Sequence, residues 1–281
     1  MYHVITDADR YPADIGSIIP RSMINDAGGT KNFITIKLSD EVKLHRRADF
    51  GRVRRPVNGR RGFKTSKFHS LKGDGKPLVM SESWVGERWM NGYFEICPSI
   101  SMFWDQRFIV EIHDNAGACW SVPDTFLKGN DGSFAFSEGK TCLVLSVLPD
   151  GSGKLVHGLP ATTHAKHLRI QNAFERAGHT YHVFDQAWSA HPIRVANIKM
   201  VLSAVRALPF GHAERLTIER VLTRNDLTVG ECARAFEGRG DCPEEWVCAA
   251  MGRGLLEIDI DRPIDRASRV SRPSAPFWRA K

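Results

Sequence analysis

Residues 122–140 read VPDTFLKGNDGSFAFSEGK, and this stretch decides the expected fold. Extended, largely apolar segments flank a central Lys-Gly-Asn-Asp-Gly turn, which is typical of two adjacent strands. Asp124 lies in the first of these strands. Glu138 and Lys140 are two residues apart in the second, so they share one face of it. We therefore expect the three side chains to meet at one point of a sheet.

The sequence around this hairpin predicts an α/β domain. A helix between two strands forms a crossover that returns the chain to the same sheet. Strands are expected at residues 31–38, 107–113, 119–127, 133–147 and 179–184, and helices at residues 78–94 and 164–177, with a short connection at residues 96–102.

From about residue 195 the pattern becomes helical. Helices are expected at residues 198–206, 213–223, 228–236 and 243–252, followed by a strand at residues 255–261. This is the order of a winged helix-turn-helix. We therefore divide the chain into residues 1–194, residues 195–270 and a basic tail at residues 271–281. The chain from about residue 262 is expected to be loosely ordered.

The three polar side chains suit phosphodiester hydrolysis. Carboxylate oxygens of Asp124 and Glu138 are ligands for Mg²⁺ or Mn²⁺, and Lys140 can orient water and counter phosphate charge. Glu87, in the helix at residues 78–94, is a candidate third metal-binding carboxylate, with Glu82 as its competitor on another helical face. A surface Asp, a solvated Glu–Lys pair and a solvated helical Glu would leave the same pattern.

Positive charge is concentrated in one segment. The chain has a formal net charge of +7, and residues 43–76 hold twelve Lys or Arg against two Asp. Such a cluster favours double-stranded DNA as a partner, because neutralised phosphates release counterions; a solvated, partly mobile basic segment is the alternative. The candidate DNA-binding residues are Arg46, Arg47, Arg52, Arg54, Arg55, Arg60, Arg61, Lys64 and Lys67.

These motifs resemble one known family. Residues 87–106, 122–127 and 138–140, together with residues 172–183 and 254–263, are similar to the TnsA-like endonuclease subunit of heteromeric transposases. The resemblance covers residues 78–266. It implies a PD-(D/E)xK nuclease with a restriction-endonuclease-like mixed sheet flanked by helices, then a mostly helical winged-helix domain. It assigns metal binding to Glu87, Asp124 and Glu138, catalysis to these three and Lys140, and a supporting role to Gln106.

The chain departs from that family at two places. Gly139 stands where a β-branched residue is more usual, and a long basic insert precedes Glu87. A glycine weakens a strand locally, so Glu138 is the residue whose geometry this departure affects most.

The resemblance also implies partners. Family members cut the 5′ ends of a transposon beside a DDE transposase subunit, and an AAA+ ATPase regulator binds their C-terminal region. The helix at residues 243–251 carries Glu244 and Glu245, which suits protein docking better than phosphate contact, and Trp246 is expected in the core.

Other function classes lack their motifs. The sequence contains no apolar run of 18 residues, no GxxxxGK[ST] loop and no GxSxG elbow. The six cysteines show no CxxC pair, and His157, His164 and His167 are interpreted as a polar surface. The first thirty residues lack the apolar core of a signal peptide, so we expect a cytoplasmic protein. The resemblance implies a bacterial protein that is associated with the nucleoid when it acts.

The sequence thus predicts a Mg²⁺-dependent endodeoxyribonuclease that cuts transposon ends. Two alternatives stay open: a stand-alone restriction-like or repair nuclease, and a non-catalytic DNA-binding regulator.

Overall fold

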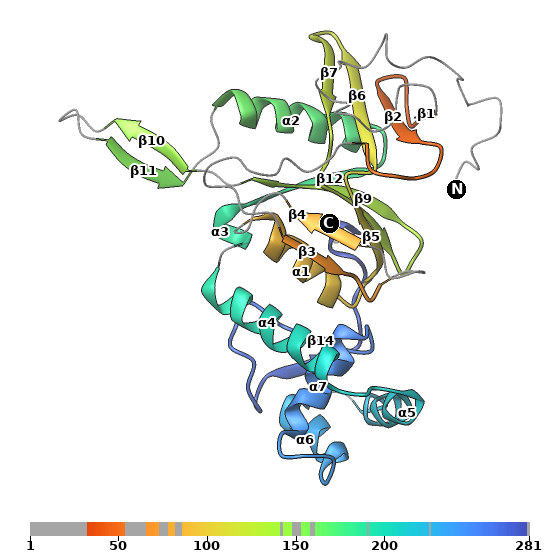
Figure 1. Ribbon diagram of the computed structural model, residues 1–281, viewed down its shortest axis with the longest axis vertical. Helices are drawn as coiled ribbons and strands as arrows, with labels where there is room; N and C mark the ends of the chain where they lie inside the picture. Colours follow the sequence, from red (N-terminus) through yellow and green to blue (C-terminus); the bar gives the residue numbers. More distant parts are fainter. Residues whose placement is uncertain are drawn as a thin grey trace.

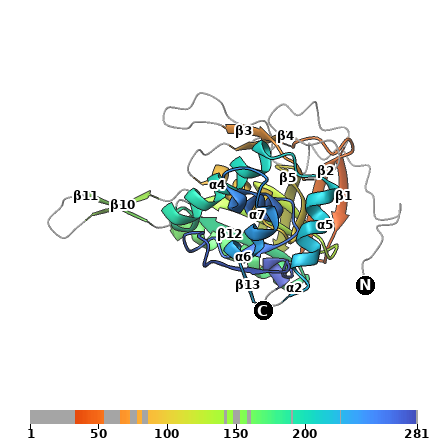
Figure 2. The same cartoon turned by 90° about the horizontal axis from the view of Figure 1, so that it is seen from below.

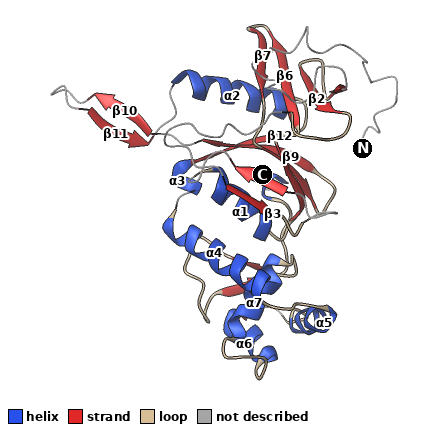
Figure 3. Cartoon of the chain, in the orientation of Figure 1, coloured by secondary structure: helices blue, strands red, loops and turns tan. Residues whose placement is uncertain are grey.

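The structure is a computed structural model of mixed α/β architecture (Figure 1). It describes residues 33–53, 66–72, 78–81, 86–140, 143–147, 153–157, 161–189, 191–224 and 226–279. Within these ranges it has seven α-helices and several antiparallel or mixed sheets. Most strands lie in the upper part of Figure 3 and helices α4 to α7 in the lower part.

A four-stranded mixed sheet carries the candidate site. Its strand order is β12-β9-β8-β5, formed by β12 (Thr180–Asp185), β9 (Phe134–Lys140), β8 (Thr125–Gly129) and β5 (Ile100–Asp105). Strand β9 pairs antiparallel with β8 and parallel with β12. A parallel pair needs a crossover, and helix α2 (Ala161–Arg176) supplies it. The expected strand–helix–strand unit is therefore present.

Two elements outside this unit extend the strand-rich half. A second antiparallel sheet has the order β1-β2-β6-β7, formed by β1 (Phe33–Lys37), β2 (Val42–Arg47), β6 (Phe108–Asp114) and β7 (Gly117–Ser121). The hairpin β10 (Leu143–Val147) and β11 (Gly153–His157) lies between β9 and α2 and projects away from the body of the chain (Figure 2).

The faces of the central sheet bury different residues. One face packs with α2 and the second sheet, through buried Phe136, Phe174 and Val110. The other packs with helix α1 (Glu87–Ile96), through buried Phe94 and Phe103. The α1 face is flanked by the small hairpin of β3 (Ser66–His69) and β4 (Leu78–Ser81).

The second half of the chain forms a helical body with a small sheet. Its helices are α3 (Gln186–Ser189), α4 (Pro192–Ala207), α5 (His212–Val221), α6 (Val229–Ala233) and α7 (Pro243–Gly252). Its three strands, in the order β13-β15-β14, are β13 (Leu227–Thr228), β15 (Arg269–Ser271) and β14 (Glu257–Ile258). Thr228 and Glu231 form the expected capping box at the start of α6. Trp246 is buried against Phe236, as expected.

Helix α1 belongs to the cores of both halves. Met90 and Phe94 pack on the central sheet, whereas Ile96 joins the core formed by α4, α6 and α7. Gly92 permits this position, because a Cβ on it would lie only 3.0 Å from Cγ2 of Ile198 in α4.

The expected helix at residues 78–94 is wrong over its first part. Residues 78–81 form strand β4, and the helix starts only at Glu87. Strand β4 pairs in register with β3, and the amide of Met80 donates to the Asp105 carboxylate over 2.7 Å. These long-range partners override a helix-like spacing of apolar residues.

Three other strand predictions need correction. Residues 133–147 form two strands rather than one, because β9 ends at Lys140 and β10 begins at Leu143 in a different sheet. Residues 119–127 are not one strand: β7 ends at Ser121, and β8 begins at Thr125 in a different sheet. Pro123 lies in the break, where a missing backbone N–H costs no ladder hydrogen bond. Strand β5 was not anticipated, since residues 96–102 were expected to be a connection.

The C-terminal stretch is not loosely ordered within the described residues. Strand β15 holds the small sheet together, and the turn at Phe277–Arg279 packs on the first half of the chain. The indole Nε1 of Trp278 donates to Ser133 Oγ over 2.8 Å, and Phe277 contacts Phe184. In the described part of the chain, no helix is both long and apolar enough to cross a bilayer.

Candidate active site

Asp124 and Glu138 meet at the edge between β8 and β9. Thr125 pairs with Ser137 in the antiparallel ladder. Asp124, one residue before Thr125, therefore lies beside Glu138, one residue after Ser137. The carboxylate of Asp124 accepts a hydrogen bond of 2.8 Å from the amide of Gly139. Asp124 is 6% exposed and Glu138 4% exposed. The structure therefore brings the two acids together, as expected from the hairpin.

Lys140 completes the group from the same strand. Its Nζ donates to Oε1 of Glu138, and its side chain is 28% exposed. Burial lowers the pKa of Lys140, but attraction to Glu138, Asp124 and Glu87 outweighs this and raises it. The amino group is therefore a stable cation within a cluster of acids.

Glu87 reaches this cluster from helix α1. It is the first residue of the helix and only 8% exposed. A Cβ built on Gly139 would lie 3.3 Å from Cγ of Glu87 and 3.4 Å from Sδ of Met90. Gly139 is paired in register with Phe184 inside β9, so its lack of a side chain makes room for Glu87 without breaking the strand.

The close approach of three acids is reflected in the protonation of Asp124. Burial raises the pKa of Asp124 well above its ordinary value, and the charges of Glu138 and Glu87 raise it further. Lys140 and the Gly139 amide act in the opposite direction but do not compensate. Ionisation of Asp124 is therefore unfavourable at this buried point, which is the electrostatic condition that a bound cation relieves.

Helix α1 is fixed over the site by a polar chain. Thr125 Oγ1 donates to Asn91 Oδ1 over 3.1 Å, and Asn91 Nδ2 donates to Ser81 Oγ over 2.9 Å. Asn91 lies one helical turn after Glu87, on the same face of α1. These bonds join the helix to β8 and β4, and so set the position of Glu87.

Gln106, the candidate supporting residue, lies directly beside Asp124. Its amide donates to the Asp124 carbonyl over 3.0 Å, and its carbonyl accepts from the Val53 amide over 2.9 Å. Gln106 has a φ of 46°, in the left-handed region, and is 2% exposed. This strained turn fixes the backbone at Asp124.

Two polar residues of the site were missed in the sequence. The hydroxyl of Tyr181 donates to Glu138 Oε2 over 3.3 Å and lies 3.2 Å from Nδ1 of His167. His167 was interpreted as part of a polar surface, which is wrong, since it is 4% exposed. Burial lowers the pKa of His167 to about 4. The sequence did contain a signal that His167 is buried, because its helical spacing from Ile170 and Phe174 places it on the buried face of α2.

The basic candidates divide into described and undescribed residues. Arg52 forms an ion pair with Asp105, whose side chain is 2% exposed, and Arg47 pairs with Asp49. Arg46 donates to the Arg47 carbonyl, and Lys67 lies in β3. The candidates outside the described residues are Arg54, Arg55, Arg60, Arg61 and Lys64, and so is Glu82.

The cluster suits a hard divalent cation by its donor chemistry, because three buried carboxylates lie near one another. The donor oxygens are, however, engaged inside the protein: Asp124 by the Gly139 amide, and Glu138 by Lys140 and Tyr181. Among the described residues, no three Asp, Glu, His or Cys side chains are already arranged around a metal position.

No protein-family model matches the chain, and no curated protein shows significant similarity to it.

Proposed function

We propose that the protein is a divalent-metal-dependent DNA endonuclease. The observation that carries this proposal is the approach of four side chains, from helix α1, from strand β9 and from the residue directly before strand β8: Glu87, Asp124, Glu138 and Lys140. Burial of charged groups costs stability, and clusters of ionisable groups with shifted pKa values are typical of functional sites. Hydrolysis of a phosphodiester uses this combination of acids and a cation.

The side chains have separate roles in the proposed reaction. Asp124, Glu138 and Glu87 would hold Mg²⁺ or Mn²⁺, which supplies a lowered water pKa and neutralises charge on the phosphate when bound. Lys140 carries its proton at Nζ and can orient water toward the phosphorus. Tyr181 holds Glu138 in place through its hydroxyl. Gln106 positions the backbone of Asp124, and Asn91 positions helix α1.

The finer assignment follows the family resemblance. The mixed sheet flanked by α1 and α2 supports a restriction-endonuclease-like arrangement, and the order α5, α6, α7 and a small sheet supports a winged helix. We propose that the protein cuts the 5′ ends of a transposon, with a DDE transposase subunit and an AAA+ ATPase regulator as partners. A stand-alone restriction-like or repair nuclease is the alternative, and efficient cleavage by the purified chain alone would favour it.

Cleavage of a supercoiled plasmid with Mg²⁺ or Mn²⁺ tests the proposal. Asp124→Asn keeps the shape of the side chain and the acceptor for Gly139 but removes a charge. We expect the cleavage rate to fall on the order of 10²–10⁴-fold. Asp241→Asn, at an exposed position in the α6–α7 connection, is the matched control and should cleave as the unaltered protein does. Equal cleavage by both variants would contradict the proposal.

A non-catalytic DNA-binding protein is the second candidate. It is favoured by one observation, namely that Lys140 and Tyr181 already occupy the oxygens of Glu138. On this alternative the protein binds neither Mg²⁺ nor Mn²⁺ at the cluster, and it binds DNA without cutting it. Calorimetric titration with Mn²⁺ separates the two, since only the nuclease should bind the ion and lose this binding in Asp124→Asn.

A further inference from the structure

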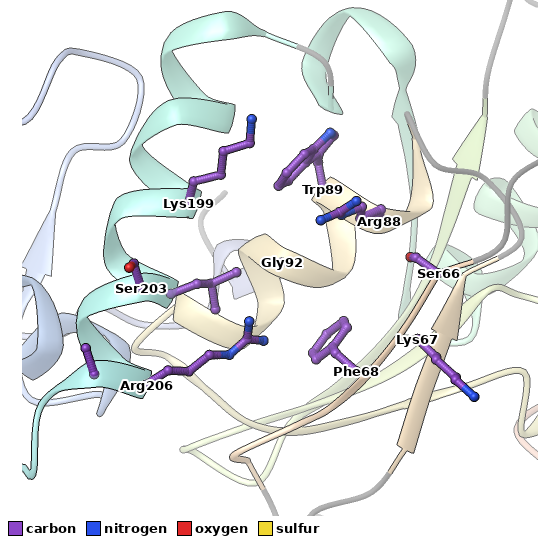
Figure 4. Close-up of a pocket in the computed structure, with 11 residues that line it drawn as sticks. Ser66, Lys67, Phe68, Arg88, Trp89, Gly92, Lys199, Ser203 and Arg206 are labelled. Carbon is purple, nitrogen blue, oxygen red and sulfur yellow. The ribbon is translucent and has the colours of Figure 1, made fainter.

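A basic pocket opens between helix α1, helix α4 and strand β3 (Figure 4). Its volume is about 760 Å³. Among the described residues that line it are four cations and no acid; the cations are Lys67, Arg88, Lys199 and Arg206. Ser66 and Ser203 add hydroxyl groups to the wall. This lining suits an anion with several oxygen acceptors.

Trp89 brings two of the cations together. The guanidinium carbon of Arg88 lies 4.8 Å from the centre of the indole ring, and Nζ of Lys199 lies 5.1 Å from it. Cations at this distance are attracted to the face of the ring. The indole of Trp89 therefore contacts one cation from α1 and one from α4 in the wall of the pocket.

Arg206 adds a third positive charge to the same space. In Figure 4, Arg88 and Arg206 point into the gap between the helices, whereas Lys67 points away from it. Burial lowers the pKa of Arg88, and the nearby charge of Arg206 lowers it further. Like charges this close repel each other, so an anion between them would be attracted by all three side chains.

The pocket lies on the opposite side of α1 from the carboxylates. Glu87 and Met90 face Gly139 of the central sheet, while Arg88, Trp89 and Gly92 line the pocket. The two surfaces meet at the first turn of α1, where Glu87 and Arg88 are neighbours in the chain. A DNA backbone that is bound in the pocket would have to pass this turn to reach Asp124 and Glu138.

We propose that Arg88, Lys199 and Arg206 bind the phosphodiester backbone of double-stranded DNA and guide it to the carboxylate cluster. The inference rests on the proposed function, because it assigns the substrate path to the same site. Separate phosphates along a strand match cations distributed over two helices, and lysine and arginine are the usual partners of DNA phosphates. This surface lies partly on α4, outside the basic run at residues 43–76.

DNA binding without divalent metal tests the inference. The double variant Lys199→Gln/Arg206→Gln leaves Glu87 and its neighbour untouched. Fluorescence anisotropy with a labelled duplex in EDTA should show an affinity loss of about tenfold or more, and the salt-dependence slope should fall by about 1.8, since each phosphate contact contributes about 0.9. Circular dichroism checks that the variant is folded.

A matched pair of arginines on another helix serves as the control. Arg215 and Arg220 are exposed on α5, so Arg215→Gln/Arg220→Gln removes the same charge elsewhere and should leave affinity and slope nearly unchanged. Unchanged binding by the α4 variant, or an equal loss in both pairs, would overturn the inference. So would an α4 variant that loses affinity for poly-glutamate but not for the duplex, because this would indicate an acidic protein partner.

The test remains separate from that of the nuclease. Asp124→Asn should bind the duplex in EDTA at least as well as the unaltered protein. If no variant or condition shows cleavage but the α4 pair still controls binding, the proposed reaction fails and the DNA path stands.

Discussion

The amide of Gly139 donates a hydrogen bond of 2.8 Å to the carboxylate of Asp124, across the β8–β9 edge. This bond joins Gly139, the residue between Glu138 and Lys140, to the acid directly before strand β8. Gly139, which has no side chain, also lies against Glu87. The stability of the cluster therefore depends on charge balance within a small buried volume.

The first prediction concerns the charge of Asp124. Because burial and two neighbouring acids raise its pKa, the ionised carboxylate destabilises the metal-free fold at neutral pH. Asp124→Asn should therefore raise the melting temperature at pH 7 in EDTA, by about 2–4 °C for each kcal/mol relieved. The gain should disappear below the ordinary carboxyl pKa of 3.8, where both folded and unfolded states are protonated. A lower melting temperature at pH 7 would contradict this charge balance.

The second prediction concerns metal binding. A ligand that binds only the folded state adds about 2.7 kcal/mol when its concentration is 100 times the dissociation constant. Saturating Mn²⁺ should raise the melting temperature of the unaltered protein but not that of Asp124→Asn. Ca²⁺ is a useful comparison, because it binds carboxylates with a larger coordination sphere. If both proteins respond equally to Mn²⁺, the ion binds elsewhere.

The third prediction concerns the Lys140–Glu138 pair. Lys140→Met removes the cation from three acids and should destabilise the fold by about 2 kcal/mol, with part of the attraction screened by solvent at the 28% exposed lysine. Glu138→Gln in the same chain should recover part of this loss. The coupling energy from urea unfolding of the two single variants and the double variant should fall within about 0.5–3 kcal/mol. Additive effects would mean that the two groups do not interact.

The fourth prediction concerns His167. Its folded pKa of about 4 lies below its ordinary value of 6.5, so the unfolded state binds a proton first as the pH falls. As the pH falls from 6.5 to about 4, the free energy of unfolding should decrease by at most about 1.4 kcal/mol per pH unit. His167→Gln should flatten the profile in this window. An unchanged slope would show that His167 does not titrate there.

The fifth prediction concerns the contact between α7 and α4. A Cβ on Gly252 would lie 2.1 Å from Cγ2 of Val205, which is too close for two carbon atoms. Gly252→Ala should destabilise the protein by about 1–3 kcal/mol in urea unfolding. The double variant Gly252→Ala/Val205→Ala should recover much of the loss, whereas Val205→Ala alone should destabilise.

The sequence predicted the proximity of the candidate side chains better than the sheet around them. Asp124, Glu138 and Lys140 were brought together by rules that act over a few residues, namely strand alternation and a Gly-rich turn. Helix α2 and strand β12 followed from the same local patterns. The break at Pro123 was missed because the residues near it in sequence do not indicate that β7 and β8 belong to different sheets.

The residues that sequence reasoning missed depend on long-range contacts. Strand β4 becomes a strand through pairing with β3 and the bond from Met80 to Asp105. Tyr181 and His167 join the site only because α2 packs over β9 and β12. The order of the C-terminal stretch depends on Trp278, whose partner Ser133 is 145 residues away in sequence.

The sharing of α1 between two cores bears on how the protein unfolds. Met90 and Phe94 can leave the central sheet only if Ile96 also leaves the helical body, because a helix of ten residues moves as a unit. The halves are therefore expected to melt in one cooperative transition rather than as independent domains. A destabilising substitution in α4 or α7 would then reduce the population of molecules whose distant carboxylates are correctly aligned.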